Sequence, residues 1–296
     1  MGRIIVGISS WADPSLVKSG GFYPPGIKTP GERLRYYAGH FSITEIDSSF
    51  HFFPTKRNLE LWLENTPEDF TFDVKAFSLF TQHPTPFTSI PGAIRTKLED
   101  AVHKESIYLH HLAPESVAEL WQSFASAVQP LKTARKLGLI LFQFPPWFHF
   151  NDDNLKYLAD CQTKLAQYPL AVEFRTADWL DEKNKGHTLD FLRQHGITLV
   201  CVDEPQGFRS SVPPVAEVTA NFGFVRFHGR NAGTWETKGI SSEERFGYLY
   251  ADDELKEWVP KIRQMAGKAS EIHVIFKNKS QDYPLRNARQ MKALLE

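Results

Sequence analysis

Cysteine is scarce in this chain of 296 residues: its two cysteines, Cys161 and Cys201, stand apart in apolar surroundings. No C-x-x-C pair and no Cys/His spacing typical of zinc sites occurs, so neither a disulfide framework nor a structural metal is indicated. An excess of one charge is also lacking, because 34 Lys and Arg residues balance 35 Asp and Glu residues for a net charge of −1. The basic surplus typical of general polyanion binders is therefore missing.

Long hydrophobic runs are absent as well. No window approaches the ~18 consecutive apolar residues that a membrane helix requires. The opening segment Met1–Ser10 carries an apolar run too short for a signal peptide, and polar residues follow it in place of a small-residue cleavage site. We therefore expect no membrane contact and, because cysteines are few, a reducing cytoplasmic location.

Eight short β-rich runs, each bounded by polar or turn residues, recur along the chain. They are Ile4–Ile8, Ile43–Asp47, Phe70–Lys75, Leu137–Phe144, Leu170–Arg175, Ile197–Asp203, Phe222–His228 and Glu271–Lys277. Helical patterns lie between them, one opened by the capping-box pair Thr29 and Glu32 and another closed by Gly196. Further helices are predicted over Lys56–Glu64, Ser116–Arg135, Asp152–Gln167, Asp253–Met265 and Tyr283–Leu295.

This alternation of strand and helix predicts an α/β fold, a parallel (β/α)₈ TIM barrel that forms a single domain over residues 1–296. An open, doubly wound sheet is the alternative. It is disfavoured because neither G-x-G-x-x-G nor G-x-x-x-x-G-K-[ST] occurs in the sequence.

One interval is too long for a loop and a helix, because about sixty residues separate Lys75 from Leu137. The sequence thus predicts an insertion after the third strand, at residues 77–112, which in a barrel would lie as a lid over the C-terminal mouth. The insertion contains His83, His103, His110 and His111. Their spacing matches no defined metal-binding pattern, so we interpret them as polar loop residues.

Side-chain alternation predicts which strand residues point into the barrel. In Val172–Arg175 and Val225–His228 the apolar residues face the helices, which leaves Glu173, Arg175, Arg226 and His228 inside. The same reasoning places ten more residues inside: Glu45, Asp47, Asp73, Lys75, Leu141, Gln143, Cys201, Asp203, Ile275 and Lys277. Nine of these fourteen positions carry a charge, where the chain average of 23% would give about three. This excess favours a functional site over the alternative, a purely structural network of ion pairs.

The inward residues nearest the C-terminal mouth form the predicted site, because barrel chemistry is placed there. Glu173, His228 and Asp203 are the catalytic candidates, with Glu173 or His228 as the proton-transfer group. An anionic substrate is expected to contact Asp47, Lys75, Gln143, Arg175, Arg226 and Lys277. No cofactor is predicted. A divalent metal on the three catalytic candidates is the alternative, disfavoured because two neighbouring guanidinium groups would repel it.

Aromatic residues gather just past the ends of the predicted strands. We expect substrate contacts from Trp11, Phe50, Trp147, Trp179 and Trp235. Flat faces around a charged cup suit a sugar or a nucleobase. The alternative is that some of these rings simply cover the top of the barrel.

Several ordered motifs resemble the YecE-like proteins, a family built on a domain of unknown function. They are Val6–Trp11, Gly21–Pro24, Tyr36–Ala38, Glu45–Phe50, Phe142–Pro145, Val172–Arg175 with Trp179, Val225–Gly229 and Phe276–Asn278. The resemblance spans essentially the whole chain and implies a (β/α)₈ barrel, but it implies no established activity. A distant likeness of such barrels to apurinic endonucleases suggests nucleic acid. The multi-histidine metal cluster of those enzymes has only His228 as a counterpart here, so their chemistry does not carry over.

Together these observations predict an enzyme, a hydrolase or a lyase, that binds a small anionic or ring-bearing substrate in the barrel mouth. Two alternatives stay open: a protein that binds or processes nucleic acid, and a non-catalytic scaffold. The first requires basic groups focused at one rim, and the second requires that all the inward charges pair with one another.

Overall fold

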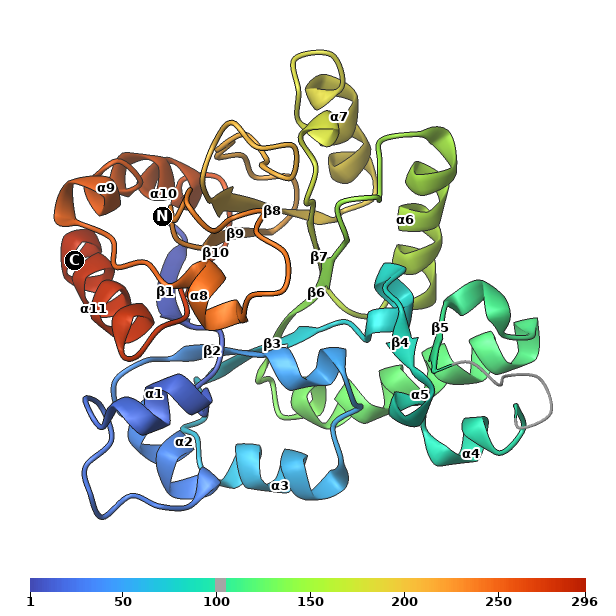
Figure 1. Ribbon diagram of the computed structural model, residues 1–296, viewed down its shortest axis with the longest axis horizontal. Helices are drawn as coiled ribbons and strands as arrows, with labels where there is room; N and C mark the ends of the chain where they lie inside the picture. Colours follow the sequence, from blue (N-terminus) through green and yellow to red (C-terminus); the bar gives the residue numbers. More distant parts are fainter. Residues whose placement is uncertain (99–104) are drawn as a thin grey trace.

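A computed structural model describes residues 1–98 and 105–296. Its eight parallel strands close into a barrel in the order β1, β10, β9, β8, β7, β6, β3, β2, and β1 also pairs with β2 (Figure 1). The strands are β1 (Arg3–Ile8), β2 (Ile43–Ile46), β3 (Thr71–Lys75), β6 (Leu137–Gln143), β7 (Leu170–Glu173), β8 (Thr198–Asp203), β9 (Phe222–Phe227) and β10 (Glu271–Phe276). All eight coincide with predicted runs, so the predicted TIM-barrel fold is confirmed.

Helices surround the barrel (Figure 1). They are α1 (Pro14–Ser19), α2 (Pro30–Ala38), α3 (Lys56–Glu64), α4 (Gly92–Arg95), α5 (Pro114–Thr133), α6 (Asp152–Lys164), α7 (Lys185–Gln194), α8 (Ser242–Phe246), α9 (Asp252–Lys256), α10 (Val259–Ala266) and α11 (Tyr283–Leu295). The predicted capping box opens α2, where Thr29 and Glu32 bond to each other's backbone amide groups. Among the described residues, no helix is both long and apolar enough to cross a membrane.

Two helical predictions need correction, and proline explains both. Residues 204–221, which connect β8 to β9, contain no helix, so the strict strand–helix alternation is wrong at this point; Pro205, Pro213 and Pro214 break up the segment. The helix predicted over Asp253–Met265 is two helices, α9 and α10. Pro260 lies in the first turn of α10, and its ring would clash with the carbonyl of Lys256 in a continuous helix.

The pairing of the strands shows which residues share the inner face, because in-register partners on parallel strands point to the same side. Glu45 pairs with Asp73 and Gln143 with Glu173. Arg226 pairs with Val202, so the inward residues of β8 are the even-numbered ones. The prediction that Cys201 and Asp203 face inward is therefore wrong. The continuous apolar run Leu199–Val202 gives no alternation from which the face could be chosen.

The predicted insertion 77–112 follows β3 and contains α4 and a short antiparallel pair, β4 (Thr85–Pro86) and β5 (Ser106–Ile107). These elements lie beside α5 at the edge of the molecule (Figure 1), where Phe80 stacks on Trp121 of α5 with 3.8 Å between ring centroids. Residues 99–104, which include His103, lie outside the described residues. Whether the insertion acts as a lid stays a prediction.

A charged cluster lies at the N-terminal end of the barrel, opposite the C-terminal mouth where the site is predicted. The buried His273 ring places Nδ1 2.9 Å from both carboxylate oxygens of Asp73 and Nε2 2.9 Å from Glu271 Oε1. Burial by itself would lower the pKa of His273, but the two carboxylates outweigh it and raise that pKa to about 9. Gly138 makes room for this pair, because a Cβ there would lie 2.4 Å from Asp73 Oδ1. The base of the barrel thus holds a buried imidazolium.

Candidate functional site

Arg226 of β9 lies at the centre of the charged interior and is fully buried. Its guanidinium donates to Glu173 Oε2, to Glu45 Oε1 at 2.8 Å and to Gln143 Oε1 at 3.4 Å. Burial would lower the pKa of Arg226, but Glu173 and Glu45 raise it above its usual value. Arg226 is therefore a fixed cation that joins β2, β6, β7 and β9.

Glu173 binds a second guanidinium on its other oxygen. Its Oε1 lies 2.5 Å from Arg175 Nη2 and 3.1 Å from His228 Nε2. Burial would raise the pKa of Glu173, but Arg175, Arg226 and His228 hold it well below its usual value. Burial and Arg175 together hold the pKa of His228 well below its usual value. Near neutral pH the site thus contains an ionised carboxylate and an uncharged imidazole, neither of which takes up a proton readily.

Arg175 carries the network from the interior to the mouth, where it meets a residue that the sequence reasoning missed. Its Nη1 lies 3.3 Å from Oε2 of Glu204, and the Val212 amide donates to Glu204 Oε1 at 2.7 Å. Burial raises the pKa of Glu204 to about 8, although Arg175 and the Val212 amide act against it. Glu204 directly follows β8, so it would have been predicted from the sequence if the even-numbered residues of that strand had been assigned to the inner face. At neutral pH Glu204 is a buried carboxylic acid.

Lysines cluster around Asp47, which follows β2. Lys277 Nζ and Lys75 Nζ lie 3.1 and 3.2 Å from the same oxygen, Asp47 Oδ1, and Lys279 Nζ lies 3.9 Å from Oδ2. Burial would raise the pKa of Asp47, but the lysines hold it well below its usual value. Three lysine side chains thus share one carboxylate. The sequence reasoning missed Lys279, which lies beyond the end of β10, although it follows Lys277 by only two positions.

These side chains line a cavity of about 360 Å³ at the barrel mouth. The wall includes Asp47, Lys75, Gln143, Arg175, Lys277 and Lys279, together with Phe50, His51, His83 and Phe246. His83 comes from the insertion; burial and Lys75 lower its pKa to about 4, so it is uncharged at neutral pH. The predicted mouth residues Asp47, Lys75, Gln143, Arg175 and Lys277 are therefore together, with cations in excess.

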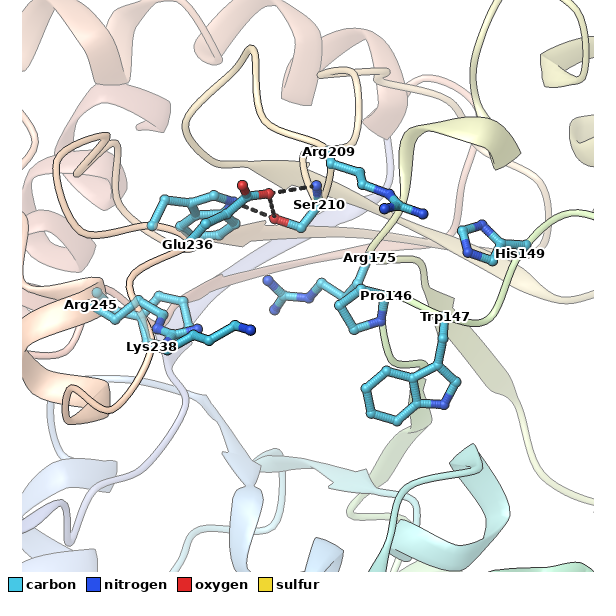
Figure 2. Close-up of a pocket in the computed structure, with 11 residues that line it drawn as sticks. Pro146, Trp147, His149, Arg175, Arg209, Ser210, Glu236, Lys238 and Arg245 are labelled. Carbon is cyan, nitrogen blue, oxygen red and sulfur yellow. Dashed lines mark hydrogen bonds between the residues drawn. The ribbon is translucent and has the colours of Figure 1, made fainter.

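A second cavity, of about 460 Å³, adjoins the first and shares Pro146, Arg175 and Phe246 with it. Trp147 and Trp235 line it, with the cations Arg209, Lys238 and Arg245 and the carboxylate Glu236. Figure 2 shows the Arg175 guanidinium and the Lys238 ammonium reaching the same space from opposite sides. Ser210 donates to Glu236 through its amide and hydroxyl groups and accepts from Trp235 Nε1. The aromatic groups and the anion-binding groups thus lie next to each other.

The aromatic predictions divide into two groups. Phe50, Trp147 and Trp235 line the two cavities as expected, and Trp147 is 53% exposed. Trp11 instead packs against Trp62 and Phe72 on the outer side of the barrel wall. Trp179 is fully buried between stacked phenylalanine rings and donates to the Phe148 carbonyl. Stacked rings enclose Trp179, so its placement at the mouth is wrong. Trp11 lines a separate cavity of about 950 Å³ that also includes Glu45 and Asp47, so its contact with a substrate stays a prediction.

Asp203, predicted as a catalytic candidate, lies in the layer between the barrel and its helices. Arg230 donates to it at 2.7 Å, Tyr250 at 2.7 Å and Trp258 Nε1 at 2.6 Å. It therefore does not join Glu173 and His228, and the alternative metal set does not assemble. In the described part of the chain, no three His, Cys, Asp or Glu side chains come together in an arrangement that would hold a metal ion.

Comparisons with known proteins agree with this architecture. Residues 5–296 match the model of a family described as "Protein of unknown function DUF72". The chain is 33% identical over 299 residues to UPF0759 protein YunF of Bacillus subtilis, an alignment that covers 99% of this chain and 95% of that protein. Crystal structures of DUF72 family proteins are similar over the whole barrel. That from Thermotoga maritima is 31% identical with a TM-score of 0.75 and covers 99% of each chain. That from Enterococcus faecalis is 26% identical with a TM-score of 0.79 and covers 99% of this chain and 95% of its own.

Proposed function

Since this chain belongs to the DUF72 family, whose function is unknown, its own barrel mouth is the basis for assigning a function. We propose that the protein is an enzyme that acts on a small anionic, ring-bearing substrate. Within the family we also propose the YecE-like relationship, on the ordered motifs from Val6–Trp11 to Phe276–Asn278. The proposed location is cytoplasmic, and the proposed chemistry uses side chains without a metal or an organic cofactor.

The observation that carries this proposal is the charge imbalance around Asp47. Lys75, Lys277 and Lys279 approach a single carboxylate, and Arg175 lines the same cavity. Like charges at this distance repel one another, and the single Asp47 carboxylate among them compensates only part of that repulsion. A phosphate or carboxylate group in the cavity would supply the missing negative charge and accept hydrogen bonds from several of these donors. The scaffold alternative is disfavoured because it requires inward charges that balance one another.

The second cavity supports a ring on the same substrate. Trp147, Trp235 and Phe246 offer flat apolar surfaces beside Arg175, which lines both cavities. A ring against an aromatic face contributes roughly 1–3 kcal/mol of binding free energy per base in nucleic-acid sites. Sugar phosphates and mononucleotides combine such a ring with an anionic group, so they are the substrate classes that we propose.

The proposed reaction is hydrolysis or elimination with acid–base assistance. As the proton donor we propose Glu204, which is protonated at neutral pH and which contacts Arg175, a residue that lines both cavities. Glu173 and His228, proposed from the sequence for proton transfer, instead position Arg175 and Arg226 through the contacts described above. Arg175, Lys75 and Lys277, which line the mouth cavity, would stabilise negative charge that develops on the substrate. Arg226, expected from the sequence to contact the substrate, is fully buried and lines neither cavity.

The test is thermal unfolding of the wild type and of Lys279→Ala with inorganic phosphate, a sugar phosphate and a nucleoside monophosphate. A ligand at a hundred times its Kd adds about 2.7 kcal/mol to the free energy of unfolding. We expect the midpoint to rise for the wild type and to rise much less for the variant. Lys268→Ala, which removes an exposed lysine on the connection leading to the N-terminal end of β10, is the matched control. An equal rise in all three proteins would contradict the proposal.

A second candidate is binding of single-stranded nucleic acid. Arg209, Lys238 and Arg245 gather on one rim beside the exposed Trp147, so basic and aromatic groups are focused there. Fluorescence anisotropy with a short labelled oligonucleotide tests it. Affinity that falls with salt and weakens in Arg245→Ala would support this function. Absence of saturable binding at low salt would reject it.

A further inference from the structure

Lys277 differs from the other lysines of the mouth in its surroundings. It directly follows β10, and its side chain is 8% exposed, at the wall of the 360 Å³ cavity. Its Nζ lies 3.1 Å from Asp47 Oδ1, the oxygen that also binds Lys75, and 3.9 Å from Glu45 Oε1. The pKa of Lys277 is lowered to about 7, mainly by burial. Lys75 and Arg226 also lower this pKa, whereas Asp47 opposes the shift. A substantial fraction of Lys277 is therefore an uncharged amine at neutral pH.

The two neighbouring lysines have different surroundings. Lys75 Nζ lies 4.3 Å from the centre of the Phe50 ring, an attraction that depends on its positive charge. Lys279 is more exposed and also lies 3.6 Å from Asp13 Oδ2. The mouth thus contains a buried amine next to two ammonium groups, an arrangement that can hold an anionic group close to a nucleophile.

We propose that Lys277 Nζ forms an imine with the carbonyl group of an anionic aldehyde or ketone that is bound in the mouth cavity. This inference rests on the proposed function, because the cations around Asp47 must bind the anionic part of the same molecule. It narrows the substrate class to compounds that carry both a carbonyl group and a phosphate or carboxylate group. It also assigns Lys277 a covalent role in place of charge stabilisation.

The step balances without an oxidant or a reductant. The lone pair of Nζ attacks the carbonyl carbon, the C–N bond forms as the C=O π bond opens, and the oxygen takes up a proton from solvent. The nitrogen loses a proton, for which Glu45 is the neighbouring acceptor, because its pKa is raised by burial and its Oε2 has no hydrogen-bond partner. This gives a carbinolamine, whose hydroxyl group takes up a proton from solvent and leaves as water while the nitrogen lone pair forms the C=N bond of a protonated imine.

Reductive trapping tests this step. The probe is pyridoxal phosphate, an aldehyde that carries both a ring and a phosphate group, and sodium borohydride reduces any imine to a stable amine. At about pH 7.5 an amine with a pKa near 7 is mostly uncharged, whereas an ordinary lysine is uncharged in about one part in a thousand. We expect peptide mass spectrometry to find Lys277 modified at least about tenfold faster than the exposed Lys268, with a half-maximal rate near pH 7.

The variants separate chemistry from folding. Lys277→Arg places a permanent positive charge at this position and cannot form an imine, so trapping at residue 277 should disappear, whereas Lys268→Arg should leave trapping of Lys277 unchanged. Because peptide mapping of the wild type alone identifies the reactive lysine, the test does not depend on a stable Lys277 variant. Modification spread evenly over the surface lysines would overturn the inference.

Inorganic phosphate distinguishes this inference from the proposed function on which it rests. If phosphate raises the unfolding midpoint and slows modification of Lys277, both stand. If phosphate raises the midpoint but Lys277 is not trapped, the imine is wrong and anion binding stands. If Lys277 is trapped at a rate that phosphate does not affect and the midpoint does not move, the amine is reactive but the proposed anion site is wrong.

Discussion

The buried His273–Asp73 pair at the N-terminal end of the barrel should make stability fall as pH rises. Folding raises the pKa of His273 from its ordinary value of 6.5 to about 9. At about 1.4 kcal/mol for each pH unit, this difference corresponds to about 3 kcal/mol of stability. Because the folded-state pKa is the higher one, that contribution is complete below about pH 6.5 and is lost as pH rises through about 9.

The assay is urea denaturation of the wild type and of His273→Gln between about pH 6 and 10. Glutamine can donate to Asp73 but carries no titrating charge. We expect the difference in free energy of unfolding, wild type minus variant, to be about 3 kcal/mol larger at pH 6 than at pH 10. The difference between the two proteins must be used, because Lys277, whose pKa is lowered by folding, stabilises the protein as pH rises over part of the same range.

The refuting result is a difference between wild type and variant that stays constant from about pH 6 to 10. It would mean that His273 has no raised pKa in the folded protein and that its ring is an uncharged hydrogen-bonding partner of Asp73. Histidine Cε1 chemical shifts, followed by NMR over the same pH range, would then locate the actual titration.

Three further predictions concern single residues. Arg226→Met leaves the buried carboxylates of the network without their shared partner and should cost roughly 3–5 kcal/mol in urea denaturation, whereas an effect below about 1 kcal/mol would show that water replaces it. Gly138→Ala places a methyl group against Asp73 and should lower the free energy of unfolding by about 1–3 kcal/mol; an unchanged value would contradict the close contact. With a substrate found by the ligand panel, the wild type should lose activity as pH rises through about 8, and Glu204→Gln should no longer show this pH dependence. A variant that still loses activity near pH 8 would exclude Glu204 as the acid.

The barrel could be predicted from the sequence because strand ends and helix ends carry local signals. The predicted runs match β2, β3 and β9 to within one residue at each end, and α3 and α11 fully. Charged residues alternate with apolar ones in Val172–Arg175 and Val225–His228, so Glu173, Arg175 and Arg226 could be assigned to the inner face from sequence alone.

The rest of the site depends on contacts that no local pattern specifies. The apolar run in β8 is compatible with either face, which led to Asp203 in place of Glu204. A tryptophan after a strand can cover the core or line a cavity, and only the packing of residues 148–179 shows that Trp179 covers the core. The second cavity combines the segments 146–149, 209–210 and 235–246, which are distant in sequence.

The ion pair between Arg226 and Glu45 joins residues that are 181 positions apart in the chain. During synthesis the first strands emerge long before β9, so Glu45 and Glu173 must remain hydrated until the C-terminal part of the barrel arrives. Contacts of such large sequence separation are typical of slow folding, and they form late. The charged interior therefore destabilises a partly formed barrel. The apolar strands can associate early, but the charged side chains at the centre become dehydrated only when the last strands pair and the barrel closes.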